Sequence, residues 1–158
     1  MNDYVEGLKI ATKKSVEDFL KQKSWAFVGA SENKKKFGGF AYRELKTKGI
    51  KLTAVNPTLE KFVDEPVYSS LSELPYPVDA VLIAVSPSKT LQIVKEASRL
   101  GIKHVWMQQG AESEEAIEFC RENGMNCIHG ECIMMFAHPA GVHRIHRFIW
   151  KVIGRLPK

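Results

Sequence analysis

Short apolar runs alternate with segments of helical character along most of this chain, and this alternation constrains the fold more than any other feature. The run over 79–85 is apolar after its first residue, as expected for a strand that helices cover on both faces. Strands separated by helices of about ten residues form a parallel sheet with right-handed crossovers. The pattern therefore predicts a doubly wound α/β fold with a sheet of five or six strands.

Glycine, proline and serine mark the ends of the predicted elements. The strands are expected over 24–29, 51–55, 67–68, 79–85, 103–107 and 125–129. The helices between them are expected over 40–48, 86–100 and 113–124, with Ser86 and Ser113 as N-terminal caps. The expected strand order is 3-2-1-4-5, to which the last run can add a sixth strand. In that order the chain switches direction between the first and fourth strands, where such folds bind ligands.

Two segments flank the predicted α/β core, which covers residues 23–135. Residues 1–22 hold an amphipathic helix from Asp3 to Lys21, with an apolar stripe on one side. Residues 136–158 form a basic tail, in which a helix over 139–153 is expected. Packing of the tail on the domain is the first expectation, and a homodimer or protein contact through it is the alternative.

Length and composition agree with one intracellular domain. At 158 residues the chain can bury its own core, and no apolar run approaches the ~20 residues that cross a bilayer. The polar N-terminus has no signal-peptide core, so a cytoplasmic location without membrane contact is expected. The net charge of +5 suits an anionic small molecule, and the lack of a basic motif interleaved with aromatic residues argues against nucleic acid.

The loop after the first predicted strand, residues 29–39, combines glycines with three lysines. Gly29 lets the backbone turn sharply, and Gly38 with the glycine after it opens the next helix start to a ligand. The free N–H groups of a helix N-terminus bind anions, and Lys36 and its neighbours add positive charge. Ser31 can donate a hydroxyl hydrogen bond. This loop is therefore the first candidate for holding a phosphate.

The same loop differs from the common nucleotide-binding fingerprints. It is not G-x-G-x-x-G, and Asn56, followed by Pro57, stands where a dinucleotide fold carries the acid that binds the ribose. An ordinary NAD-dependent dehydrogenase is therefore disfavoured, although Asn56 can still hydrogen-bond a sugar or a base. No G-x-x-x-x-G-K-[ST] sequence is present, which argues against an ATPase or GTPase.

Two further loops are expected at the same edge of the sheet. The second loop holds Val85, Ser86 and Pro87. Its serine can bind a phosphate or simply cap the following helix. The third loop holds Gln108, Gln109 and Gly110. Its two neutral amides suit a polar ligand, and they can equally well end a strand.

The segment Cys127-Ile128-His129-Gly130-Glu131-Cys132 places two cysteines and a histidine close together. A structural zinc site uses two well-spaced pairs of ligands, and no such double pair is evident, so no metal is expected. The chain has three cysteines, an odd number that argues against a disulfide framework. Cys132 follows the last strand, where an inert buried thiol is the first expectation and proximity to a ligand thiol is the alternative.

Five short motifs occur in a characteristic order. They are Val28-Gly29-Ala30-Ser31, Phe37-Gly38-Gly39, Val55-Asn56-Pro57, Val78-Asp79-Ala80-Val81 and Val105-Trp106-Met107-Gln108-Gln109-Gly110. Together they resemble the stand-alone CoA-binding domain proteins, which are similar to the N-terminal CoA-binding domain of the succinyl-CoA synthetase α subunit and of NDP-forming acyl-CoA synthetases. The resemblance covers about residues 20–135. It implies a Rossmann-like fold with coenzyme A or an acyl-CoA across the carboxyl edge of the sheet.

The resemblance also implies where each loop meets the ligand. Gly29, Ala30 and Ser31 are assigned to the phosphates, which Lys36 also reaches, and Phe37 and Gly38 are ligand-binding residues of the same loop. The adenosine side is assigned to Asn56 and Pro57; the middle of the ligand to Val85, Ser86 and Pro87; and the pantetheine side to Gln108, Gln109 and Gly110. The phosphorylated histidine of succinyl-CoA synthetase belongs to a domain outside this resemblance, so no histidine receives that role. Gly130-Glu131 replaces an acidic-basic pair that many relatives carry before Cys132.

The combined interpretation is a binding or regulatory module for coenzyme A or an acyl-CoA, without chemistry of its own. No acid–base pair, nucleophile–base pair or phosphoryl donor domain is evident, and whether the chain is an enzyme stays open. Two alternatives remain. One is an NAD(H)-binding redox sensor or reductase, and the other is a partner subunit of an NDP-forming acyl-CoA ligase.

Overall fold

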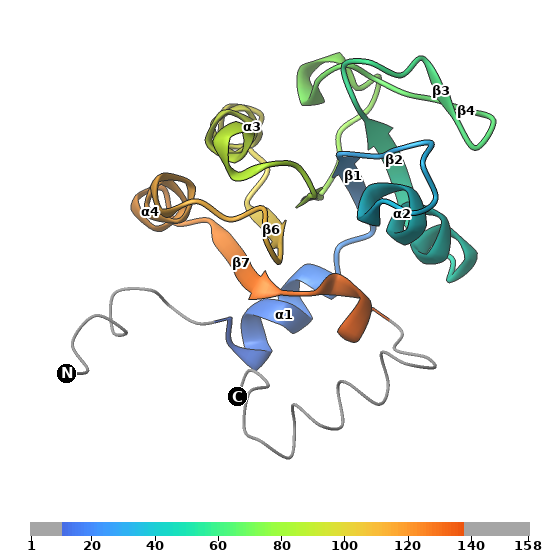
Figure 1. Ribbon diagram of the computed structural model, residues 1–158. Coiled ribbons are helices and arrows are strands. Elements are labelled where there is room, and N and C mark those ends of the chain that lie inside the picture. Colours follow the sequence, from blue (N-terminus) through green and yellow to red (C-terminus); the bar gives the residue numbers. More distant parts are fainter. Residues whose placement is uncertain (1–10, 138–158) are drawn as a thin grey trace.

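The computed structural model describes residues 11–137, which build a parallel sheet between layers of helices (Figure 1). The strands of the sheet are β1 (Ser24–Val28), β2 (Lys51–Val55), β5 (Ala80–Ile83), β6 (His104–Gln108) and β7 (Asn126–Glu131). The helices are α1 (Lys13–Leu20), α2 (Phe37–Thr47), α3 (Pro87–Arg99) and α4 (Glu114–Glu122), and the 3₁₀ turns are η1 (Leu71–Glu73) and η2 (Ile133–Met135).

The strand order is β2-β1-β5-β6-β7, and every neighbouring pair is parallel. The chain runs from β1 to one edge and then crosses β1 to build the other half, which confirms the predicted doubly wound order. The predicted third strand, 67–68, is reduced to a single bridge between Tyr68 and Val55 on the outer side of β2. The predicted sixth strand is present as β7.

Side chains of the sheet alternate between two hydrophobic layers. Trp25 and Phe27 of β1 join the layer beneath α1 and α2, whereas Ala26 and Val28 join the layer beneath α3 and α4. Neighbouring positions of a strand point to opposite faces, so one continuous apolar run can fill both layers. Full burial of a large apolar side chain stabilises the fold by about 1.5–3 kcal/mol.

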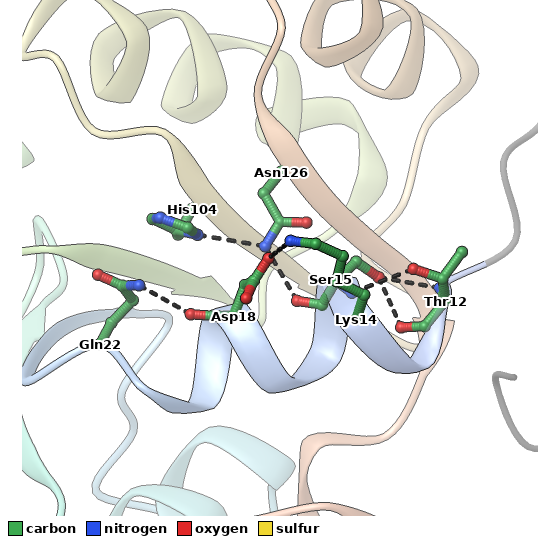
Figure 2. Close-up of polar contacts among 7 residues, drawn as sticks. All are labelled: Thr12, Lys14, Ser15, Asp18, Gln22, His104 and Asn126. Atoms are coloured by element: carbon green, nitrogen blue, oxygen red, sulfur yellow. Dashed lines mark hydrogen bonds and ion pairs between the residues drawn. The ribbon is translucent and has the colours of Figure 1, made fainter.

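Helix α1 packs against the amino-terminal ends of β6 and β7 (Figure 2). Thr12 and Ser15 cap it reciprocally: Thr12 Oγ1 accepts from the Ser15 N–H at 3.1 Å, and Ser15 Oγ accepts from the Thr12 N–H at 2.9 Å. Asn126 Nδ2 donates to the Ser15 carbonyl at 2.9 Å and lies 3.2 Å from His104 Nδ1. The Phe19 ring packs 4.9 Å from that of Trp25. These contacts hold the helix on the sheet.

Both flanking predictions extend beyond the described residues. The helix expected from Asp3 begins only at Lys13, because Thr12 has an extended backbone and forms its N-terminal cap. It ends at Leu20, and the predicted part before residue 11 lies outside the described residues. The helix expected over 139–153 lies entirely outside residues 11–137. No helix within residues 11–137 is long and apolar enough to span a membrane.

The structure adds a hairpin that the sequence analysis did not predict, formed by β3 (Lys61–Phe62) and β4 (Glu65–Pro66). Its turn residues, Val63 and Asp64, have φ of 53° and 59°. Such turns usually carry Asn or Gly, so the β-branched Val63 gives no sequence indication of a hairpin turn here. Tyr42 of α2 donates from its hydroxyl to Glu65 Oε2 at 3.0 Å, and this contact holds the hairpin against the domain.

Candidate ligand-binding site

A cleft of about 470 Å³ opens at the carboxyl edge of the sheet, where the chain direction switches between β1 and β5. The ends of β1 and β2, the loops after β2 and β5, and one side of α3 form its walls. The lining residues are Val28, Gly29, Val55, Asn56, Pro57, Thr58, Ser69, Leu71, Val85, Ser88, Lys89, Gln92, Ile93 and Glu96. The lining therefore combines apolar side chains with polar and charged ones, which is the usual construction of a small-molecule site.

Glycine is required at the turn that leaves β1. Gly29 has φ of +106°, and a Cβ added there would lie 2.2 Å from the carbonyl oxygen of Ala84. A Cβ added at Gly38 would lie 1.9 Å from the Gly29 carbonyl oxygen. The sequence analysis expected Gly38 to open the helix start to a ligand, but this position faces protein backbone. The glycines let α2 begin directly beside the end of β1, which places its N-terminus at the sheet edge.

The N-terminus of α2 has no side-chain cap, and among its first-turn N–H groups that of Gly39 donates to the Lys36 carbonyl at 3.1 Å. Lys36 occupies the N-terminal cap position without a side-chain cap hydrogen bond, and the first turn contains no acidic residue. Such a helix end attracts anions through its N–H groups and its dipole. Lys36 and the two lysines before it are exposed. Ser31 Oγ accepts from the Asn33 N–H at 3.2 Å, so this hydroxyl oxygen supports the loop itself.

Asn56 ties the two loops that flank the cleft. Its Nδ2 donates to the Ala30 carbonyl at 2.7 Å, linking the end of β2 to the turn after β1. Its Oδ1 accepts from the N–H and the hydroxyl of Thr58, both at 2.8 Å. The side chain predicted to bind a sugar or base therefore also braces the site. Ala30 itself is fully buried, so any contact it makes with a ligand goes through its backbone.

The loop before α3 reaches the cleft in part. Val85 lines the cleft, whereas Ser86 and Pro87 are exposed and lie outside its lining. Ser86 occupies the predicted cap position, but its side chain makes no cap hydrogen bond, and its Oγ lies 3.3 Å from Ser88 Oγ. The expectation that the Ser86 side chain caps α3 is therefore wrong, although Ser86 does occupy the cap position.

The contribution of α3 to the cleft was not predicted from the sequence. Ser88, Gln92 and Glu96 follow each other at intervals of four residues, and Lys89 and Ile93 do the same one position later. Residues four apart share a helix face, so this spacing was the available signal.

The third predicted loop lies apart from the cleft. Gln108 is buried, and its Oε1 accepts from the Ile133 N–H at 3.1 Å. Gln109 and Gly110 are exposed, and the Gly110 N–H donates to Glu112 Oε2 at 2.8 Å. β6 is two strands away from β1, a distance of about 10 Å along the sheet edge. A ligand that contacts both regions must therefore be long.

Glu131 ends β7 next to Gln108. Its side chain is buried, and burial raises the pKa of its carboxyl group to about 7. Its Oε2 is shielded from solvent and has no hydrogen-bond partner among residues 11–137. The sequence analysis noted this residue only as a departure from its relatives, because no pattern in one sequence shows an unpaired buried oxygen.

The cysteine and histidine cluster forms no metal site within the described part of the chain. No group of three or more His, Cys, Asp or Glu side chains there could hold a metal ion. The hydrogen bond with Cys120 and then burial raise the pKa of the Cys127 thiol. Cys127 is thus an uncharged thiol, which is a poor metal ligand and a poor nucleophile.

Comparison with known proteins gives relatives of two sizes. The chain is 29% identical over 126 residues to the α subunit of an ADP-forming acetate–CoA ligase from Pyrococcus furiosus, covering 73% of this chain and 28% of that subunit. It resembles the structure of a conserved hypothetical protein from Pyrococcus furiosus with 39% identity and a TM-score of 0.68, covering 71% of this chain and 97% of that one.

A solved synthetase structure also contains a region similar to this chain. A dinucleotide-forming acetyl-coenzyme A synthetase from Ca. Korarchaeum cryptofilum, solved with phosphate and ADP, matches with 27% identity and a TM-score of 0.61. The match covers 70% of this chain and 26% of the synthetase, so the chain spans about a quarter of that relative. The family model described as the CoA binding domain matches residues 23–138, which include the cleft and the whole sheet. On this evidence, the chain belongs to the CoA binding domain family.

Proposed function

We propose that this protein binds coenzyme A or an acyl-CoA across the carboxyl edge of its sheet, as a binding module without chemistry of its own. The observation that carries the proposal is the cleft between β1 and β5, beside the uncapped N-terminus of α2. A nucleotide with a long arm matches both features. Its base fits an apolar cleft, and its phosphates fit a helix end with three lysines nearby.

The ligand follows the order of the loops. The adenosine group occupies the cleft between Pro57 and Val85, and the diphosphate lies over the turn after Gly29. Lys36 adds positive charge at the helix end, and Ser86 can reach the middle of the ligand. The pantetheine arm then runs toward the loop over 108–110.

Isothermal titration calorimetry with CoA, acetyl-CoA, NAD and ATP tests this assignment. We expect binding of CoA or acetyl-CoA and weaker binding of NAD and ATP. Stronger binding of NAD would favour the redox sensor or reductase instead, and no CoA binding at millimolar concentration would remove the proposal.

A cleft variant shows whether binding occurs at the proposed place. Val85→Trp puts a large ring into the cleft, and we expect the CoA affinity to fall at least about tenfold, the equivalent of about 1.4 kcal/mol. Leu100→Trp is the matched control, because Leu100 is exposed at the far end of α3. Equal affinities in the two variants would place the binding site elsewhere.

A second candidate function is a subunit of an acyl-CoA ligase. The relevant observation is that two ligase relatives contain this domain as about a quarter of their length. Purification under native conditions, followed by an assay of acetyl-CoA formation from acetate, CoA and ATP, tests it. A second polypeptide at fixed stoichiometry together with turnover would support a subunit. The chain alone, without turnover, would favour the independent binding module.

A further inference from the structure

Glu131 lies on the same sheet edge as the cleft, at the far end of the sheet from β2. Its side chain is only 6% exposed, and its Oε2 lacks a hydrogen-bond partner among residues 11–137. Native proteins rarely leave a buried carboxyl oxygen unpaired, and each exception requires an explanation such as a ligand.

A β-bulge sets the direction of this side chain. From Trp106 to Gln108 β6 advances two residues, while β7 advances three, from Ile128 to Glu131. The extra residue reverses the alternation of faces, so Glu131 stands on the same face as Gln108. Gly130, with φ of 71°, supplies the backbone conformation. Bulges often re-aim a side chain next to a functional site, and this one turns a carboxyl group into the protein at the ligand edge.

The recorded hydrogen bonds of Glu131 involve its backbone and leave its Oε2 without a partner among residues 11–137. Its carbonyl accepts from Trp106 Nε1 at 3.1 Å and from the Gln109 N–H at 3.2 Å, but both are backbone contacts. Burial is the sole cause of its raised pKa of about 7. The carboxyl group holds its proton up to about neutral pH.

The length of the ligand arm matches the distance from the cleft to Glu131. β7 is three strand spacings from β1, a distance of about 14 Å. Four extended residues span about this length, and the pantetheine arm contains a comparable number of chain bonds. The arm carries amide carbonyls, and an acyl-CoA adds a thioester carbonyl at its end. Each is a hydrogen-bond acceptor that a protonated carboxyl group can pair.

We propose that the Glu131 carboxyl group, in its protonated form, donates a hydrogen bond to a carbonyl oxygen of the ligand arm, which makes ligand binding proton-linked. This inference rests on the proposed function. Above neutral pH the carboxylate can only accept, so it repels the carbonyl oxygen unless it takes up a proton. Bound ligand therefore keeps the proton on Glu131.

The test is calorimetry of the full chain with CoA and with acetyl-CoA from about pH 6 to about pH 9, on both sides of the Glu131 pKa. For the unmodified protein, we expect Kd to rise about tenfold per pH unit above that pKa. Glu131→Gln keeps an N–H donor at every pH, so its Kd lacks this rise. Glu122→Gln, an exposed position on α4, is the matched control and keeps the pH profile of the unmodified protein.

The comparison isolates Glu131 because the ligand phosphates titrate identically with every variant. A rise in Kd with both ligands supports an amide carbonyl as the acceptor, and a rise with acetyl-CoA alone supports the thioester. Parallel profiles for the unmodified protein and Glu131→Gln would overturn the proposal and leave CoA binding intact. A pH-independent Kd of the unmodified protein would overturn it without any variant. Failure of the unmodified protein to bind CoA would instead remove the proposed function.

Discussion

Gly29 shows how one residue sets the geometry of the site. Its positive φ and the carbonyl of Ala84, 2.2 Å from where a Cβ would stand, both exclude a side chain. We expect Gly29→Ala to lower the free energy of unfolding more than Gly49→Ala. Gly49 also has a positive φ, of +80°, but nothing lies within 4 Å of its added Cβ, so its cost is the backbone strain of about 1–2 kcal/mol. Urea denaturation of both variants measures the difference, and equal losses would contradict the packing argument.

Glu131 gives the free protein a dependence of stability on pH. Burial raises its pKa in the folded state to about 7 from the ordinary 4.5, so the unfolded chain releases this proton more readily. The stability from the neutral acid is complete below the unfolded pKa and is lost as pH rises through the folded pKa, by at most about 3 kcal/mol.

Glu131→Gln removes this loss, and we expect the variant to be more stable than the unmodified protein at about pH 8, by on the order of 1–3 kcal/mol. At about pH 4 the difference disappears, because both side chains are then neutral. Urea denaturation at the two pH values measures it, with Glu122→Gln as control. A constant difference at both pH values would contradict a buried titrating carboxyl group.

At the scale of elements, α1 acts as part of the domain core. Phe19 is fully buried, with its ring 4.9 Å from Trp25 and 5.4 Å from Trp106. We expect Phe19→Ala to lower the free energy of unfolding by about 3–5 kcal/mol. Leu20→Ala is the control, because Leu20 is only partly buried and its loss leaves a smaller cavity. Similar small losses from both changes would show that α1 adds little to the fold.

The sequence predicted the elements of the sheet better than those of the loops. Strand order and helix positions followed from the apolar runs and from residues that end or cap helices, such as Gly49 and Ser113. Hairpin β3–β4 could not be predicted, because its turn residues have unfavourable φ and tertiary contacts of Tyr42 hold it. The start of α2 at Phe37, three residues before the expected Phe40, depends on backbone contacts of the glycines, which no propensity describes.

The candidate site was predicted in outline only. Gly29, Asn56, Pro57 and Val85 line the cleft, as the switch-point argument requires. The face of α3 was missed, since its polar residues have the spacing of any solvated helix. Gln108 was predicted to bind the ligand because its amide is polar, but its amide oxygen accepts a hydrogen bond from the Ile133 N–H. A pattern identifies which residues reach an edge, whereas their hydrogen-bond partners depend on the folded neighbours.

At the scale of the whole molecule, ligand binding adds to stability. A ligand that binds only the folded state stabilises it by about 2.7 kcal/mol at a hundredfold excess over Kd. We therefore expect CoA to raise Tm more than NAD at equal concentration, and we expect added salt to reduce the shift, because it screens the lysines from the phosphates. Differential scanning fluorimetry at low and high salt measures both effects. A Tm that is insensitive to CoA, while NAD raises it, would favour the dinucleotide alternative.

The hydrogen bond from Asn56 to the Ala30 carbonyl joins two loops before any ligand arrives. Much of the conformational entropy of these loops is therefore lost when the chain folds, and association leaves mainly the ligand to be immobilised. The ligand-free and ligand-bound forms should superpose closely in these two loops. The association rate should be governed by diffusion and charge instead of by loop closure.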